Sequence, residues 1–144
     1  MTTQTAFNPN SPTTKEDHLA VEIRLHQILD AAKYGNAEAL ASYHLYGPKF
    51  TKFDDFEPLD RQEAEEARAG EDAITEVQNF TYKVEDLRID VFGPAAVATF
   101  VMHYGFESEG DRIDTKARST LVLVADGPEW KIAHEHLSSF TPNP

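Results

Sequence analysis

Hydrophobic residues in the first third of the chain repeat at helical spacing. Apolar side chains recur every three or four positions, at Val21, Leu25, Ile28, Leu29 and Ala32. This spacing places them on one face of an α-helix. Thr13 and Glu16 form a possible capping box at its start, and Gly35 with Asn36 would end it and cap the next helix. We therefore predict a first helix from about residue 14 to residue 34.

The next segment is predicted to contain two shorter helices and an irregular connection. Ala37 to about Leu45 has helical composition and is followed by Gly47-Pro48, which breaks a helix. Residues 49–56 carry phenylalanines among charged residues, which is typical of a short strand or an irregular segment. A third helix is predicted over residues 61–69, with Gly70 interrupting it and with a further turn through Ala73-Ile74 as an alternative.

The second half of the chain alternates with the period of two that is typical of strands. Four such runs, over residues 80–91, 95–106, 112–125 and 130–138, are separated by turn sequences such as Gly93-Pro94 and Asp126-Gly127-Pro128. In the first run the apolar residues change parity near Glu85-Asp86, which predicts a β-bulge and a sharp bend. The pattern predicts an antiparallel meander preceded by helices.

The last run combines core residues with reactive side chains. Strict alternation would place on one face Trp130, Ile132, His134, His136 and Ser138. Two imidazoles beside an aromatic and an aliphatic residue make His134 and His136 the first candidates for chemistry near neutral pH.

The two middle strands are apolar on both faces, whereas an antiparallel sheet usually has one solvated face. Phe100 and Met102 alternate with Val97 and Val101. The helices can cover one face, and a second copy of the chain is the simplest cover for the other. We therefore expect a homodimer that forms through the sheet.

Composition and charge narrow the possible partners. The chain has 144 residues, enough for a single domain, which we place at residues 14–140 after a flexible arm of residues 1–13. Its formal net charge of −12 argues against nucleic acid or anionic membrane as a partner. Ten acidic residues fall between Asp54 and Glu76, and we expect this segment to face solvent. The chain contains no cysteine, no run of membrane-spanning length and no signal-peptide pattern, so we expect a cytoplasmic protein.

Two motifs lie near the end of the chain: Thr115-Lys-Ala-Arg-Ser-Thr120 and Asp-Gly-x-x-Trp-Lys-Ile-x-His-x-His-x-Ser. Together with the order of helices followed by a strongly bent sheet, these motifs carry a resemblance to the NTF2-like superfamily. Within it, residues 15–140 are most similar to SnoaL-like proteins, DUF4440-type proteins and the association domain of calcium/calmodulin-dependent kinase. The resemblance implies an α+β fold, a cone-shaped roll of helices on a bent mixed or antiparallel sheet. It also implies a pocket between helices and sheet and dimers through the sheet.

Members of this superfamily include isomerases, dehydratases, cyclases, hydrolases and assembly modules, so the fold does not determine the function. Two hypotheses follow. The chain is either a small-molecule-binding domain, with histidine-dependent proton transfer on a carbonyl or hydroxyl compound, or a non-catalytic module for homodimerisation and ligand binding. The expected partner is a small molecule, with an anionic ligand as one alternative.

Arg118 is the strongest single candidate for binding a ligand. It lies among small and apolar residues of a predicted strand, where an unpaired guanidinium would be costly. The resemblance to kinase association domains would place it in the pocket, opposite a carboxylate or another anion. The alternatives are an ion pair with Glu135 or another acid, and access to solvent at the strand end.

Four aromatic residues complete the candidate site. Tyr82, His103 and Trp130 lie on the predicted strands, and Tyr43 lies beside His44 and Tyr46, where the resemblance places one wall of the pocket. For each of these residues, as for His134 and His136, the alternative to a role in the site is a structural role in the core or at the dimer interface.

We expect neither a metal nor a cofactor. His134 and His136 would need a third metal ligand, such as His103, Asp54 or Asp55. No predicted strand carries a buried acid of the kind that the superfamily's isomerases use as a base.

Overall fold

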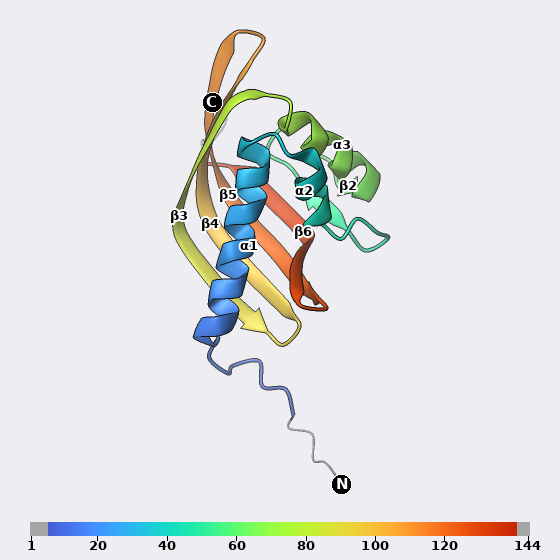
Figure 1. The fold of residues 1–144 in the computed structure, drawn as a ribbon, viewed down its shortest axis with the longest axis vertical. Coiled ribbons are helices and arrows are strands. Elements are labelled where there is room, and N and C mark those ends of the chain that lie inside the picture. The colour runs from blue at the N-terminus through green and yellow to red at the C-terminus, as the bar shows by residue number, and fades with distance from the viewer. Residues whose placement is uncertain (1–5, 141–144) are drawn as a thin grey trace.

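The computed structural model of the chain describes residues 6–140 as helices packed against one curved sheet (Figure 1). The helices are α1 (Lys15–Lys33), α2 (Ala37–Ser42) and α3 (Ala64–Ile74). The strands are β1 (Thr51–Phe53), β2 (Gln62–Glu63), β3 (Gln78–Phe92), β4 (Ala95–Ser108), β5 (Asp111–Asp126) and β6 (Glu129–Ser139).

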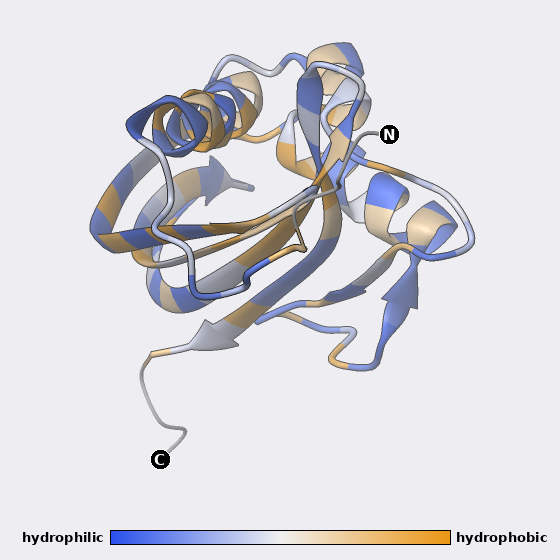
Figure 2. Ribbon diagram, turned by 90° about the horizontal axis from the view of Figure 1, so that it is seen from below, coloured by the Kyte–Doolittle hydropathy of each residue, from blue (hydrophilic) through white to orange (hydrophobic). Residues whose placement is uncertain are grey.

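The strands form one mixed sheet in the order β2-β1-β6-β5-β4-β3. Strands β3 to β6 are the predicted antiparallel meander, and β1 runs parallel to β6. The helices lie on the same side of the sheet, which curves around them when seen from below (Figure 2). The predicted α+β class is confirmed, in its mixed-sheet form.

The start of α1 differs from the prediction by one residue. Thr14, not Thr13, is the N-cap, and its hydroxyl accepts a hydrogen bond from the Asp17 N–H at 3.1 Å. Thr13 instead accepts from the Val91 N–H at 3.0 Å and so ties the N-terminal segment to β3. Residues 6–13 form no helix or strand, and the rest of the predicted arm, residues 1–5, lies outside the described residues.

The chain between α2 and β1 runs alongside β6. The second helix ends at Ser42 rather than Leu45, because the backbone of residues 43–45 pairs with Ile132. The Leu45 N–H donates to the Ile132 carbonyl, and the Ile132 N–H donates to the Tyr43 carbonyl, both at 2.9 Å. The backbone here pairs with the sheet instead of continuing the helix. This pairing places His44, which lies between Tyr43 and Leu45, against the core side of β6.

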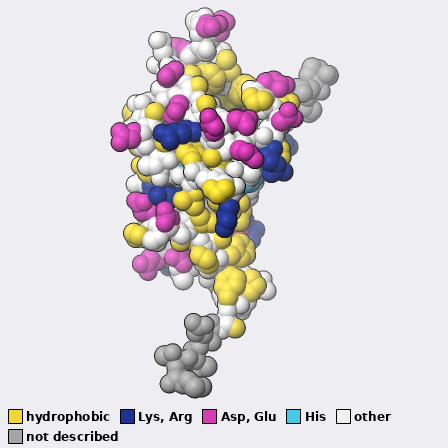
Figure 3. Space-filling view, turned by 90° about the vertical axis from the view of Figure 1, so that its right-hand side faces the viewer, with side chains coloured by type: hydrophobic (Ala, Val, Ile, Leu, Met, Phe, Trp, Pro, Cys, Tyr) yellow, Lys and Arg dark blue, Asp and Glu magenta, His cyan; other side chains and the backbone are white. Residues whose placement is uncertain are grey.

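The third helix starts later than predicted, and it includes the further turn through Ala73-Ile74 that the sequence left as an alternative. It begins at Ala64 and continues through Gly70 to Ile74. The acidic segment that contains it is solvent-exposed for the most part. Asp and Glu side chains are scattered over the upper half of the molecular face seen in Figure 3. Glu71 departs from the expectation because it is buried, with 6% of its surface exposed.

The bend predicted in the first long strand is present. The β3–β4 register shifts between Glu85 and Arg88, and Asp86 has a positive φ of 51°. This bulge moves the apolar face from even to odd positions, as the sequence indicated.

A second bulge, which the sequence analysis missed, reverses the faces of β6. Ile132 pairs with Leu123 and His134 pairs with Val122, so Ala133 is an extra residue in the strand. As a result Ile132 and Leu137 both face the core, with exposed fractions of 0% and 7%. The expectation that Ile132, His134 and His136 share one face is therefore wrong.

The core lies between α1 and the concave face of the sheet. Its largest fully buried side chains are Phe50, Leu25, Leu123, Ile132 and Val21. None of the helices within residues 6–140 is long and apolar enough to cross a membrane.

The bulge at Ala133 leads to a stability prediction for two neighbouring residues. Leu137→Ala should lower the free energy of unfolding by about 2–5 kcal/mol, because it removes a buried aliphatic side chain. His136→Ala should change it by only about 0.5 kcal/mol, because His136 is exposed. Urea titration of both variants measures the difference, and the reverse order would contradict the observed register.

Candidate functional site: the cavity between helices and sheet

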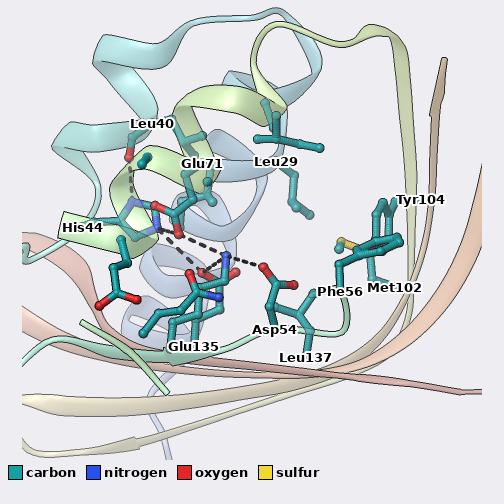
Figure 4. A pocket seen from close by; sticks show the side chains of 18 of the residues that line it. Leu29, Leu40, His44, Asp54, Phe56, Glu71, Met102, Tyr104, Glu135 and Leu137 are labelled. Atoms are coloured by element: carbon teal, nitrogen blue, oxygen red, sulfur yellow. Dashed lines mark hydrogen bonds and ion pairs between the residues drawn. The ribbon is translucent and has the colours of Figure 1, made fainter. Parts of the chain in front are cut away.

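A cavity of about 640 Å³ lies between the helices and the concave face of the sheet. Its apolar wall comes from α1, the sheet and the segment after β1, with Leu29, Phe56, Met102 and Tyr104 visible in Figure 4. The opposite wall carries a group of ionisable side chains. The lining residues are Ile28, Leu29, Ala32, Leu40, His44, Lys52, Asp54, Phe56, Glu57, Pro58, Gln62, Glu66, Ala69, Gly70, Glu71, Ile74, Phe80, Met102, Tyr104, Phe106, Glu135 and Leu137.

Five ionisable residues, His44, Lys52, Asp54, Glu71 and Glu135, form what we call the charged cluster (Figure 4). They come from the segment after α2, from strand β1 and the residue after it, from α3 and from β6. The tertiary fold therefore brings together residues up to 91 positions apart in the sequence, from 44 to 135.

His44 is at the centre of the polar wall, and 2% of its side chain is exposed. Its Nδ1–H donates to the Leu40 carbonyl at 2.7 Å, one turn earlier in α2, which orients the ring. Its Nε2 lies 3.1 Å from Glu71 Oε1 and 3.8 Å from Glu135 Oε2. The ring of Tyr46 stacks on the imidazole with a centroid distance of 4.9 Å.

Lys52 extends along the same wall. Its Nζ lies 3.4 Å from Glu71 Oε1, 3.6 Å from Glu135 Oε2 and 3.6 Å from Asp54 Oδ2. The exposed fractions of the Lys52 and Glu71 side chains are 9% and 8%, and those of Glu135 and Asp54 are 17% and 28%. The cluster is thus most buried at His44, followed by Glu71 and Lys52, and most accessible at Asp54.

The buried environment separates the protonation states of the two glutamates. Burial and the neighbouring Glu135 together raise the pKa of Glu71 to about 8, against the opposing effect of His44. Burial acts in the same direction on Glu135, but the charge of Lys52 and the contact with His44 outweigh it and hold the pKa of Glu135 well below its usual range. At neutral pH Glu71 therefore carries a proton and Glu135 is ionised.

The same carboxylates keep His44 charged. Burial by itself would lower the pKa of His44, but its contacts with Glu135 and Glu71 raise it to about 9. Burial likewise opposes the charge on Lys52, and Glu135 and Asp54 together raise the pKa of this lysine. With Glu71 neutral, two cations, His44 and Lys52, balance two carboxylates, Glu135 and Asp54.

A second polar contact joins the segment after β1 to the sheet. The Tyr104 hydroxyl donates to Asp55 Oδ2 at 2.8 Å. Burial and the adjacent Asp54 raise the pKa of Asp55 to about 6, while burial and Asp55 raise the pKa of Tyr104. Tyr104 and Phe56 both line the cavity, so this hydrogen bond holds one side of its mouth in place.

Three members of the charged cluster also have the geometry of metal ligands. The ligand atoms of His44, Glu71 and Glu135 all lie within 4.8 Å of one another. None of the third ligands considered from the sequence, His103, Asp54 and Asp55, belongs to this set.

The structure places the two predicted catalytic histidines outside the cavity. His134 is partly buried and its Nδ1 lies 2.9 Å from Thr51 Oγ1, and His136 is exposed. Phe53 of β1 contacts both rings, with centroid distances of 6.3 and 5.5 Å. The Ala133 bulge turns both to the outer face of the sheet, and Glu135 and Leu137 line the cavity in their place.

Arg118 is also on the outer face, and its side chain is exposed. Its guanidinium lies 4.2 Å from the centre of the Phe140 ring, and Nη1 donates to the Ser139 carbonyl at 3.5 Å. The alternative ion pair between Arg118 and Glu135 is not formed, because Glu135 points into the cavity and contacts Lys52 and His44.

The remaining predicted ligand-binding residues have partners elsewhere. The Tyr82 hydroxyl donates to Asp30 of α1 at 2.6 Å, and His103 Nε2 lies 2.9 Å from Glu85 Oε2 on the outer face. Tyr43 and Trp130 are partly buried and pack against the core. None of these residues lines the cavity.

Sequence reasoning missed Lys52, Glu71 and Glu135, although two signals were present. Lys52 is two positions after the buried Phe50, so a strand places both on one face, and a lysine on such a face needs a partner. Glu71 follows Ala67 by one helical turn, on the buried face of α3. Glu135 gave no comparable signal, because its inward orientation depends on the Ala133 bulge.

The family model of the SnoaL-like domain matches residues 21–142. This chain belongs to the SnoaL-like domain family. A search of curated proteins by sequence gives no match. The cavity described above is therefore that of a SnoaL-like domain.

Solved structures of the NTF2-like family have the same fold. One is a proposed dehydratase of that family from Streptomyces avermitilis, with a TM-score of 0.79 and 18% identity, covering 90% of this chain and 100% of the other. Another is a proposed scytalone dehydratase from Novosphingobium aromaticivorans, with a TM-score of 0.76 and 13% identity, covering 88% and 85%.

A third similar structure is a proposed calcium/calmodulin-dependent protein kinase II association domain from Xanthomonas campestris. Its TM-score is 0.72 at 14% identity, and it covers 96% of this chain and 100% of the other. At these identities the likeness concerns the fold alone.

The raised pKa of His44 predicts a pH dependence of stability. His44 binds its proton more tightly in the folded than in the unfolded protein, so its contribution is fully present below pH 6.5 and is lost as pH rises through about 9. The shift from 6.5 to about 9 corresponds to about 3 kcal/mol. We expect urea titrations to show a fall in the free energy of unfolding between pH 6.5 and 9.5.

His44→Gln is the control, because glutamine does not titrate. The variant should be less stable than the wild type at pH 6.5, and the difference between the two should shrink toward pH 9.5. Part of the wild-type slope below pH 8 belongs to Glu71, whose raised pKa has the same sign of effect. A constant difference across this range would show that His44 is not held protonated.

Proposed function

We propose that this chain binds a mostly apolar small molecule in the cavity and catalyses proton transfer at a carbonyl or hydroxyl group of that molecule. The observation that carries the proposal is the charged cluster on one wall of a mostly apolar cavity. The isomerase and dehydratase classes of reaction fit such a site, because both move a proton to or from carbon or oxygen.

The size and lining of the cavity support a small-molecule ligand. Its volume of about 640 Å³ is within the range of about 300–1,000 Å³ that is typical of ligand pockets. Side chains such as Leu29, Met102, Phe106 and Leu137 would contact the ligand body. The carbonyl or hydroxyl group of the ligand would contact the charged cluster.

Glu71 is the proposed proton donor. It lines the cavity, it is protonated at neutral pH, and its Oε2 has no hydrogen-bond partner among the described residues. When Glu71 gives up its proton, the resulting carboxylate lies beside two cations, His44 at 3.1 Å and Lys52 at 3.4 Å. Preorganised charges of this kind stabilise charge that develops during a reaction.

The histidine of this mechanism is His44, and it acts as a fixed cation. Its raised pKa keeps it protonated at neutral pH, so it is not available as a base there. The catalytic roles of His134 and His136 stay predictions, and they would require a ligand on the outer face of the sheet. The anion-binding role of Arg118 also stays a prediction with the same requirement.

Substitution of Glu71 tests the proposed proton transfer. Uncharged aromatic carbonyl and hydroxyl compounds that raise the melting temperature of the wild type are first identified and then assayed for turnover. Glu71→Gln keeps the shape of the side chain but cannot give up a proton. We expect it to retain binding and to lower kcat by about 10²–10⁴-fold.

Glu65→Gln is the matched control, because Glu65 lies on the same helix, is exposed and does not line the cavity. It should leave kcat unchanged. His136→Ala separates the alternatives: loss of turnover in this variant, with full turnover in Glu71→Gln, would reject the cavity as the catalytic site.

The outer face of the sheet favours a second, compatible function, which is homodimerisation. The helices lie on the opposite face, and this outer face carries Val97, Val101, Val122 and Val124. These valines are partly buried rather than fully buried in the single chain. We propose that a second copy covers them, so the chain can serve as a dimer module whether or not it is catalytic.

Light scattering tests the dimer. At micromolar concentration the wild type should have twice the monomer mass of 16.1 kDa. Val101→Glu should give the monomer mass, because it places an unpaired charge at the centre of the proposed interface. Glu109→Gln, in the exposed turn between β4 and β5, is the control and should remain dimeric. A monomeric wild type would reject this proposal.

A further inference from the structure

Lys52 occupies an unusual position for a lysine. Its side chain is 9% exposed and its ammonium faces three carboxyl groups, those of Asp54, Glu71 and Glu135, at 3.4–3.6 Å. Charge-assisted hydrogen bonds between nitrogen and oxygen are shorter, at about 2.7–2.9 Å. Lys52 therefore acts mainly as a positive charge placed among the carboxylates.

The residues around Lys52 resemble a set of metal ligands. His44 Nε2 lies 3.1 Å from Glu71 Oε1 and 3.8 Å from Glu135 Oε2. Bond lengths of about 2.1 Å in tetrahedral zinc sites separate two ligand atoms by about 3.4 Å, which lies between these two distances. One imidazole and two carboxylates leave a fourth position open, as catalytic zinc sites do.

The surroundings of these residues also suit a metal. The other ring nitrogen of His44 donates to the Leu40 carbonyl at 2.7 Å, and backbone contacts of this kind commonly orient metal-binding histidines. The Glu71 side chain is more than nine-tenths buried, and its Oε2 has no hydrogen-bond partner within residues 6–140. A buried carboxyl oxygen without a partner is a position where a cation would be favourable once it displaces the proton of Glu71.

A metal ion and the Lys52 ammonium would compete for the same oxygens. Glu71 Oε1 and Glu135 Oε2 each face both His44 Nε2 and Lys52 Nζ. A divalent ion bound to these two oxygens would lie next to the ammonium, in a buried environment where like charges repel strongly. The two cations therefore exclude each other.

We propose that Lys52 is a built-in counter-cation that takes the place of a divalent metal ion among His44, Glu71 and Glu135 and so keeps the cavity free of metal. A metal ion that binds here displaces the protons of His44 Nε2 and Glu71. Removing the ammonium leaves the carboxylates of the cluster without one of their two cations. A divalent ion then becomes the cation that balances them. This inference does not depend on the proposed proton transfer, because metal binding is measured without a substrate.

The test compares Zn²⁺ and Co²⁺ binding to the wild type, Lys52→Met and Lys52→Gln by calorimetry and by visible absorption of the cobalt forms. Lys83→Met, an exposed lysine on the outer face, controls for the loss of one positive charge. We expect binding at the cluster in both Lys52 variants and in neither the wild type nor Lys83→Met. At zinc concentrations 100-fold above Kd, the folding equilibrium constant of Lys52→Met should rise about 100-fold, which is seen as a higher melting temperature.

A second substitution assigns the bound ion to the cluster. Lys52→Met combined with Glu71→Gln removes one ligand and should lose the zinc-dependent stabilisation and the cobalt absorption. If Lys52→Met is unfolded without metal, recovery of its circular dichroism on addition of zinc is the expected result.

Three results would overturn the proposal. The wild type could bind zinc at the cluster as tightly as Lys52→Met, which would show that Lys52 does not exclude metal. The folded Lys52 variants could bind no zinc. Both variants could also stay unfolded with and without zinc, which would show that His44, Glu71 and Glu135 do not form a metal site when the lysine is absent.

Discussion

The charge balance inside the cavity is the constraint on which the arrangement of this domain depends. Charged groups taken out of water are costly unless each has a partner, and removing one member of a buried pair typically costs about 3–5 kcal/mol. His44 and Lys52 balance Glu135 and Asp54, and Glu71 stays neutral because burial raises its pKa. Every element around the cavity must therefore hold its charged residue in place for the others to be tolerated.

The backbone supplies these residues through irregularities rather than regular structure. The segment of residues 43–45 leaves the helix and pairs with β6, which brings His44 to the wall of the cavity. The bulge at Ala133 turns Glu135 inward, and the short parallel strand β1 places Lys52 next to it. Bulges of this kind often re-aim side chains at functional sites.

The fold of this chain is shared with proteins described as dehydratases and with one described as a kinase association domain. The fold alone therefore does not show whether the function is catalysis or assembly. In this chain the two possibilities use opposite faces of the sheet. The concave face holds the cavity and the charged cluster, and the convex face holds partly buried valines together with Arg118, His103, His134 and His136. Both functions can therefore coexist in one molecule, because neither requires residues of the other face.

The sequence by itself determined the fold class, the four long strands and the bend at Glu85-Asp86, because helical and strand periodicities and turn residues are local properties. It also indicated a pocket, through the family resemblance. It could not place the site residues, because one extra residue at Ala133 reverses the faces of β6 and no local pattern marks it. His134 and His136 therefore lie outside, and Glu135 lies inside. Only the tertiary structure decided that Lys52 and Glu71 meet there, because their contact joins a strand and a helix that are distant in sequence.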